Sequence, residues 1–298
     1  MFGCIRARHL GVSFIARNMT DPRTSTRQNR GTSAHNEARV VYSKRSVRVS
    51  FGMAIISHGA QDGVYEKMTE LLDRLPRGRL LDLPAGHGDL SAVARDLGFQ
   101  VRSADLDPSV FRAEGLTCDA ADMNAPLPYE DGTFDVAICA EGIEHIENPY
   151  LLARELRRVL VKGGNLVLTT PNVLSLPSRL RFLLTGLPSY FDYHWTLQQW
   201  GHIAPIGAPE LILALSRAGF TIEEITTSRV TTMAKRLRPL GPLVRMASRK
   251  MVMDSSLREL TTDENVLFGE ILFVRARAGG PPLATDSYPF EVPEPLDA

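Results

Sequence analysis

A glycine-bearing turn between two aspartates is the feature of this sequence that most clearly points to chemistry. In LLDLPAGHGDLS (80–91), Asp82 closes an apolar run and Gly86 and Gly88 follow it. Glycines in such a turn let a ligand approach the backbone, and amides at the start of a following helix can donate hydrogen bonds to it. Asp105 ends the next apolar run, where a carboxylate can accept hydrogen bonds from the hydroxyls of a ribose. Together these residues indicate an adenosine-containing cofactor.

Two departures from the dinucleotide-binding pattern indicate which cofactor the turn suits. Ser91 stands at the third glycine position of GxGxxG, and Asp82 stands where a pyrophosphate binder usually has an apolar residue. A carboxylate at that position favours a cation over a phosphate. S-adenosylmethionine carries an ammonium and a sulfonium group and no phosphate, so it fits the turn. A nicotinamide-dependent oxidoreductase is a weaker alternative.

Alternating apolar patterns place these residues on a sheet. The periodicity predicts helices over 62–75, 90–98, 149–160 and 208–220, and strands over 79–83, 100–107, 134–139, 163–170, 221–225 and 269–276. Gly163 and Gly164 are expected to form the turn that opens the fourth of these strands. Such alternation is typical of an α/β fold with a doubly wound parallel sheet and helices on both faces. We therefore expect the site just after the first four strands, at their carboxyl ends.

Several motifs in a fixed order are similar to those of class I S-adenosylmethionine-dependent methyltransferases, the broad family that includes small-molecule, quinone and sugar-modifying enzymes. The resemblance spans about residues 62–277. It rests on LLDLPAGHG, VRSADLDP, CDAADMNAPLPYEDGTFDVAIC, AEGIEHIENP, LRRVLVKGGNLVLTTPN and GHIAP followed by LILALSRAGF. It implies a Rossmann-like, mostly parallel, seven-stranded sheet whose last strand is antiparallel.

The resemblance also implies which residues bind S-adenosylmethionine. They are Asp82, Ala85, Gly86, Gly88, Asp105, Asp122 and Met123. The first four would lie along the methionine and ribose part of the cofactor, and Asp105 would hold the ribose hydroxyls. Asp122 would accept a hydrogen bond from the adenine amino group, and Met123 would pack on the ring. Pro84 departs from the family pattern, because it stands at the usual first glycine and has a fixed φ and no amide.

Methyl transfer from a sulfonium requires alignment of nucleophile, methyl and sulfur and the exclusion of water, and it requires no metal. A hydroxyl acceptor would benefit from a general base, for which His145 and Glu141 are the candidates. Glu141 directly follows the strand over 134–139, whereas His145 could instead cap or pack its loop. His194 and His202 are weaker candidates. The Glu-His pair that ends in His145 is similar to one in related quinone-type enzymes.

Two longer segments interrupt the alternating pattern. The first, 172–205, is dense in aromatic residues and is predicted to be a lid over the acceptor, or else the core of a helical cap. The second, 228–262, combines basic residues with Leu, Val and Met. It could contact an anionic membrane or a phosphorylated substrate, although a solvated amphipathic helix pair is the favoured interpretation.

Charge and cysteine content restrict the partners and the compartment. The formal net charge is zero, but the first fifty residues are strongly basic, so the remainder is mildly acidic. A mildly acidic body argues against nucleic acid and favours a small-molecule or glycan acceptor. The three cysteines are not spaced as CxxC and indicate reduced thiols in a cytoplasmic compartment. No apolar run approaches the length of a membrane span.

Composition divides the chain into three parts. Residues 1–52 are predicted to be a disordered basic extension, translated from a start upstream of a natural start at Met53, and an organelle-targeting segment is the alternative. Residues 53–278 would form the methyltransferase domain with its two inserts. Residues 279–298 are expected to be a flexible, proline-rich, acidic tail.

The predicted function is methyl transfer from S-adenosylmethionine to an oxygen or carbon atom of a small molecule, quinone or glycan intermediate. Enzymes that methylate amino groups of adenine or glutamine carry an Asn-Pro-Pro-Tyr-like sequence where this chain has CAEGIEH, which argues against that class of acceptor. The alternative is a catalytically silent methyltransferase-like module that binds the cofactor or a protein. The sequence does not indicate an oligomeric state.

Overall fold

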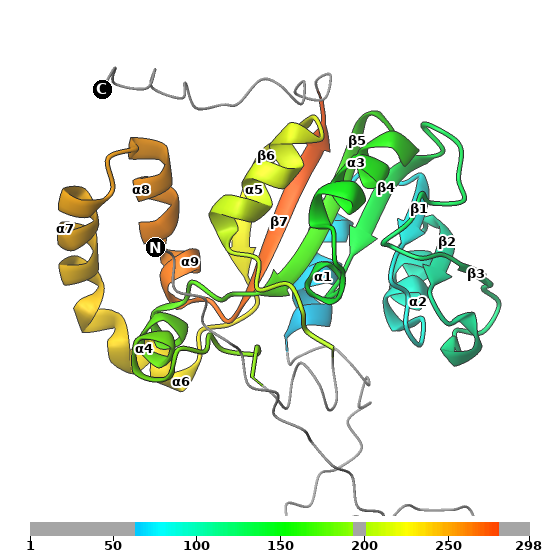
Figure 1. Ribbon diagram of the computed structural model, residues 1–298. Coiled ribbons are helices and arrows are strands. Elements are labelled where there is room, and N and C mark those ends of the chain that lie inside the picture. The colour runs from blue at the N-terminus through cyan, green and yellow to red at the C-terminus, as the bar shows by residue number, and fades with distance from the viewer. Residues whose placement is uncertain (1–62, 193–200, 280–298) are drawn as a thin grey trace, which may run out of the picture. The chain divides into compact units, whose positions relative to one another are not determined.

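One seven-stranded sheet organises the computed structural model, which describes residues 63–192 and 201–279. Its strands, in the order β3-β2-β1-β4-β5-β7-β6, are β1 (Arg79–Asp82), β2 (Gln100–Asp105), β3 (Cys118–Ala120), β4 (Phe134–Cys139), β5 (Leu160–Pro171), β6 (Phe220–Thr227) and β7 (Ile271–Ala278) (Figure 1). Strands β1 to β5 pair in parallel, and β7 is antiparallel to both β5 and β6. The predicted α/β class, with a mostly parallel seven-stranded sheet and an antiparallel last strand, is confirmed.

Helices cover both faces of the sheet, as predicted. They are α1 (Val64–Asp73), α2 (Asp89–Asp96), α3 (Pro149–Val159) and α5 (Ala208–Arg217). The apolar stripes of α1 and α2 share one core cluster with Leu80, whereas those of α3 and α5 share another with Leu81. Because successive strand residues point to opposite faces, these two leucines show that β1 is buried on both sides.

The start of β5 differs from the prediction. Gly163 and Gly164 do not precede the strand, because β5 already begins at Leu160. Leu160 pairs with Phe134, and the register then shifts before Asn165. Gly163, with φ of 83°, lies within this irregularity. A bulge that needs positive φ explains the glycine and makes it part of the strand.

A second group of helices gathers beside the sheet at its β6 side (Figure 1). It contains α4 (Leu176–Thr185), α6 (Thr232–Leu237), α7 (Gly241–Met251), α8 (Ser255–Thr262) and α9 (Glu264–Phe268). Leu176, Ala234, Leu267 and Phe268 form its small buried core. The insert over 172–205 contributes α4 to this group, and the insert over 228–262 folds into three α-helices and a short 3-10 helix rather than a helix pair. No helix in the described parts of the chain is long and apolar enough to cross a bilayer.

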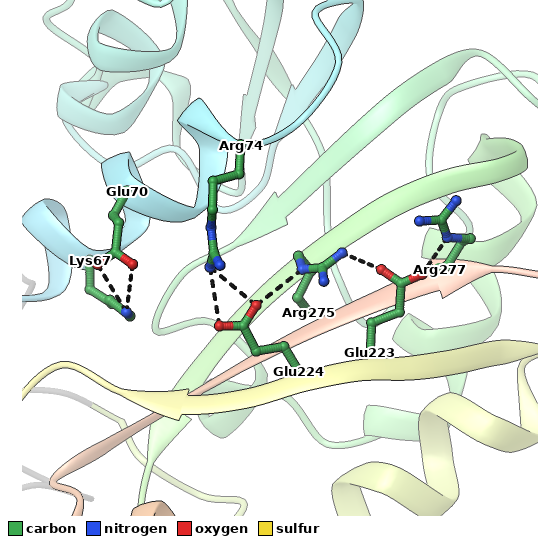
Figure 2. A network of polar contacts seen from close by, with 7 residues as sticks. All are labelled: Lys67, Glu70, Arg74, Glu223, Glu224, Arg275 and Arg277. Carbon is green, nitrogen blue, oxygen red and sulfur yellow. Dashed lines mark hydrogen bonds and ion pairs between the residues drawn. The ribbon is translucent and has the colours of Figure 1, made fainter.

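A ladder of charged side chains crosses β6 and β7 and reaches α1 (Figure 2). Glu223 and Glu224 are sequence neighbours, yet both pair with Arg275, because the β6–β7 register shifts just before Glu224. Arg74 of α1 reaches Glu224 at 3.1 Å, and Arg277 pairs with Glu223. Such partly exposed pairs each contribute about 0–1 kcal/mol. Their main effect is to orient α1 and to keep the edge strand β6 charged, which opposes pairing with another sheet.

Several sequence predictions fall outside the described residues. They are the extension over 1–52, all but the first residue of the tail over 279–298, and His194 within the aromatic insert.

Candidate active site

The glycine loop after β1 is tied directly to the end of β2. The backbone N–H of Ala85 donates to the carbonyl of Ala104 at 2.8 Å, and that of Gly86 donates to the Asp105 carboxylate at 2.8 Å. Gly88 precedes α2 with φ of 90°, and a Cβ there would lie 2.5 Å from the Phe111 ring. Positive φ and close packing both require glycine at that position.

Asp82 is fully buried at the end of β1. The Ser91 hydroxyl donates to its Oδ2 at 2.5 Å and also contacts the Ser103 hydroxyl at 2.7 Å. Its Oδ1 is buried without a hydrogen-bond partner among the described residues. Burial raises the pKa of Asp82 to about 7 against the opposing effect of the Ser91 bond, and the charge of Asp105 adds to the rise. The serine at the third glycine position therefore has a structural role, which is to donate a hydrogen bond to the Asp82 carboxyl.

The two acidic positions expected to bind ribose and adenine lie at neighbouring strand ends. Asp105 Oδ1 accepts from the backbone N–H of Asp107 at 3.0 Å, and the Asp105 carbonyl accepts from Ala121 N at 2.9 Å. Asp122 directly follows and accepts from Asn124 N at 2.8 Å. Met123 is partly buried and packs on the main core.

An exposed apolar residue lies beside these acids and has little signal in the sequence. Leu106 directly follows Asp105 and is 73% exposed. Its exposed apolar side chain lies next in sequence to the carboxylate that is expected to bind the ribose. Its only sequence signal is its position in the motif VRSADLDP.

Glu141 has an unusual backbone conformation just after β4. Its φ is 50°, which is uncommon for a residue other than glycine and typical of functional sites. The Thr169 hydroxyl of β5 accepts from its backbone N–H and donates to its carboxylate, both at 2.9 Å. Burial raises the pKa of the Glu141 carboxyl to about 7, the Thr169 bond opposes the rise, and the charge of Glu270 adds to it.

Glu144 is fully buried close to Glu141. One carboxylate oxygen accepts from the Thr170 hydroxyl at 3.3 Å, whereas Oε1 is buried and has no hydrogen-bond partner among the described residues. Burial raises the pKa of Glu144 well above its usual value, and the charge of Glu141 adds to the rise. Its backbone carbonyl accepts from the N–H groups of Ile203 and Ala204 at 2.9 and 3.0 Å.

These two backbone bonds bring His202 to His145. The two rings meet edge to face with centroids 4.8 Å apart. His202 is almost fully buried, and its Nδ1 lies 3.0 Å from the Tyr190 carbonyl oxygen. Burial lowers the pKa of His202 to about 4, with a further contribution from His145. His202, a weaker candidate in the sequence, therefore lies in the same cluster as the predicted base.

The predicted site residues thus fall into two neighbouring groups at the carboxyl end of the sheet. A direct hydrogen bond joins the glycine loop to Asp105, and β1 pairs with β4, which leads to Glu141 and His145. The first group combines a glycine loop with strand-end carboxylates, and the second combines carboxyl and imidazole side chains.

Comparison with known proteins identifies the family. Residues 58–225, more than half of the chain, match a family model described as a methyltransferase domain. The chain belongs to this methyltransferase family. The predicted relationship to class I S-adenosylmethionine-dependent methyltransferases is therefore confirmed, and S-adenosylmethionine follows as the cofactor of that class.

Two relatives and one solved structure of another protein are similar to this methyltransferase. A ubiquinone biosynthesis O-methyltransferase of Xanthomonas campestris pv. campestris (strain B100) is 33% identical over 109 residues, which cover 33% of this chain and 45% of that protein. Its counterpart in Xanthomonas euvesicatoria pv. vesicatoria (strain 85-10) is 28% identical over 173 residues, covering 51% and 66%. The chain thus spans less than half of the length of the first relative. A solved structure from Bacillus halodurans C-125 shares the fold, with a TM-score of 0.50 and 18% identity over 72% of this chain and 99% of that one.

Proposed function

We propose that the protein is a cytoplasmic enzyme that transfers the methyl group of S-adenosylmethionine to an oxygen or carbon atom of a small molecule, with quinone and glycan intermediates as the acceptor classes. The observation that carries this proposal is the hydrogen bond that joins the glycine loop to Asp105, beside a cluster of two carboxyls and two imidazoles of which Glu144 and His202 are buried. The unpaired thiols of Cys118 and Cys139 support a reducing compartment.

The residues of the first group fit the cofactor. The Oδ1 atom of Asp82 is a buried acceptor without a partner among the described residues, and a cationic ammonium would satisfy it. The loop at Gly86 and Gly88 allows close approach of the ligand to the backbone. Asp105 would hold the ribose hydroxyls, because each carboxylate oxygen can accept a further hydrogen bond beside those it already has. Asp122 and Met123 would then contact the adenine.

The second group would handle the acceptor. Bound S-adenosylmethionine supplies an activated methyl group, so the protein must align the acceptor atom and exclude water. A hydroxyl acceptor must also lose its proton, and Glu141 and His145 are the groups proposed to accept it. A carboxyl with pKa near neutrality, such as that of Glu141, is well suited to this task. The insert over 172–205 is proposed to close over the acceptor.

An oxygen acceptor has the strongest support. The two relatives described above are named as ubiquinone biosynthesis O-methyltransferases. The first of them matches this chain over less than half of its own length. A hydroxyl on an aromatic ring would fit a site with two carboxyls and two imidazoles, because these groups can take up its proton. No feature of the described residues favours the catalytically silent alternative.

Labelled S-adenosylmethionine tests this proposal. The protein is incubated with the labelled cofactor and demethylated quinone precursors or extracts of its source cells, and the products are identified by mass spectrometry. We expect a labelled product, and Glu141→Gln should lower the rate by on the order of 100-fold without weakening cofactor binding. Retained cofactor binding with no methyl transfer to any acceptor pool would favour the silent module instead.

The segment 228–262 is also proposed to touch an anionic membrane surface. Exposed apolar side chains on and after α7 are Leu243, Met246, Met251 and Met253. Arg249 and Lys250 lie among them in the sequence, and this combination favours anionic lipid. Co-sedimentation with phosphatidylglycerol vesicles should exceed that with phosphatidylcholine vesicles. Leu243→Ser combined with Met246→Ser should reduce it, and Leu187→Ser, outside the segment, should not. Equal sedimentation of all proteins would contradict the proposal.

A further inference from the structure

We infer that Glu144, His145 and His202 bind a divalent metal ion on the acceptor side of the site. One ligand atom from each residue lies within 4.8 Å of the others. Bonds of about 2.1 Å place two ligand atoms of one cation at most about 4.2 Å apart. The three ligand atoms therefore need to approach one another only slightly to bind the same ion.

The carboxylate of Glu144 provides an independent reason for a cation. The side chain is 0% exposed, and its Oε1 is buried with no hydrogen-bond partner among the described residues. The Thr170 hydroxyl orients the other carboxylate oxygen. A buried carboxylate with an unsatisfied oxygen is costly unless a cation or a donor meets it. A metal ion held with the two histidines would meet it.

His202 has the orientation of a metal ligand. Its Nδ1 lies 3.0 Å from the Tyr190 carbonyl oxygen, and because a carbonyl only accepts hydrogen bonds, the proton of the ring must be on Nδ1. The lone pair of the neutral ring is then on Nε2. Histidines that bind metals usually donate their other N–H to a carbonyl or carboxylate in this way, which fixes the tautomer and the ring orientation.

The backbone holds two of the proposed ligands together. The Glu144 carbonyl accepts hydrogen bonds from Ile203 and Ala204, the residues that follow His202. The edge-to-face contact between the imidazoles then sets His145 beside His202. The sequence predicts no metal requirement, because methyl transfer from a sulfonium needs none, and the long-range contact between the two histidines has no local signal in the sequence.

The donor set indicates the class of ion. Two imidazole nitrogens and one carboxylate suit borderline transition cations such as Zn²⁺, Fe²⁺ and Mn²⁺, whereas Mg²⁺ and Ca²⁺ favour sites composed of oxygen ligands. Three protein ligands leave coordination positions open. If the proposed methyl transfer holds, these positions would take acceptor oxygens, the metal would favour loss of the hydroxyl proton, and Glu141 rather than His145 would accept that proton.

Calorimetric titration of the chelator-treated full chain tests the site without any acceptor or S-adenosylmethionine. We expect one equivalent of Zn²⁺ or Mn²⁺ to bind the parent, with affinity at least about 100-fold weaker in Glu144→Gln and in His202→Ala. Glu147→Gln, an exposed carboxylate on the same loop, should bind as the parent does. Electron paramagnetic resonance of bound Mn²⁺ should show nitrogen coupling that His202→Ala reduces.

The outcomes separate this site from the proposed function. Circular dichroism and S-adenosylmethionine binding are measured on each variant, and His145→Asn replaces any variant that fails to fold. Metal binding without cofactor binding would retain the site and overturn the methyl-transfer proposal. Cofactor binding with no stoichiometric metal, or with equal metal affinity in parent and ligand variants, would overturn the site and show that the cluster is an ordinary buried hydrogen-bonded group.

Discussion

The carboxylate of Asp105 accepts a hydrogen bond from the backbone N–H of Gly86, with 2.8 Å between Oδ2 and N. This bond joins two motifs that the sequence identifies separately, the glycine loop and the acid at the end of β2. The conformation of the loop therefore depends on the same side chain that is proposed to hold the ribose. A change at Asp105 should affect both.

Substitution of Gly88 should be more damaging than that of another glycine with similar backbone angles. Gly88→Ala places a Cβ at positive φ and 2.5 Å from the Phe111 ring, whereas Gly98→Ala meets positive φ alone, with no heavy atom within 4 Å. We expect Gly98→Ala to cost about 1–2 kcal/mol and Gly88→Ala clearly more. Urea unfolding measures both, and partial recovery in Gly88→Ala with Phe111→Ala would attribute the difference to the clash. Equal losses in the two single variants would contradict this packing.

Removal of the Ser91 hydroxyl should destabilise the fold. Ser91→Ala leaves the buried Oδ2 of Asp82 and the Ser103 hydroxyl without this partner, and we expect a loss of about 1–3 kcal/mol in the free energy of unfolding. Ser109→Ala is the matched control, because Ser109 also donates to an aspartate but is exposed. Its loss should stay within about 0.5 kcal/mol. Similar unfolding midpoints for the two variants would show that the buried Ser91–Asp82 hydrogen bond stabilises the fold no more than the exposed Ser109–Asp107 bond does.

The affinity for S-adenosylmethionine should depend on pH through Asp82. The pKa of this carboxyl is raised to about 7 in the unliganded fold, so the group is protonated below that pH and ionised above it. A cation binds the ionised form better, and the affinity should therefore rise by up to about tenfold per pH unit as the pH approaches 7 from below and then level off.

Two measurements check this pH dependence. Calorimetry near pH 7 in buffers of different ionisation enthalpy should show proton release on binding in the parent. Asp82→Asn cannot ionise, so its weaker binding should vary little with pH over the same range. A parent affinity that is flat between pH 5 and 8 would place the cofactor cation away from Asp82.

Local patterns were sufficient to predict the frame of the site. The strand that ends at Asp82, the glycine turn and the strand that ends at Asp105 have strong apolar and turn signals, and each signal lies within a few residues. The strand β3 (Cys118–Ala120) has no such signal, because it is only three residues long and none of them is fully buried. The sequence predicts a turn at Gly163 where the structure has a bulge, because a glycine pair has the same local signature in a turn and in a bulge.

Long-range contacts explain what local patterns did not show. Nothing near His202 in the sequence indicates that backbone bonds to Glu144 bring it to His145. The role of Ser91 also depends on a long-range contact. The sequence shows that Ser91 departs from the glycine pattern, but its hydrogen bond to Asp82 depends on how α2 packs against β1. Pairs of this kind require the folded sheet.

Calorimetric titration of the parent and of Asp105→Ala with S-adenosylmethionine, and with NAD as a comparison ligand, tests whether the glycine loop and Asp105 bind this cofactor. We expect the parent to bind S-adenosylmethionine at one site and not to bind NAD, and we expect Asp105→Ala to lose at least about tenfold in affinity because it removes a charge-assisted hydrogen-bond acceptor. Asp107→Ala, which changes an exposed neighbouring acid, should bind nearly as the parent does. No binding of S-adenosylmethionine by the parent, or unchanged binding by Asp105→Ala, would contradict the proposed cofactor site.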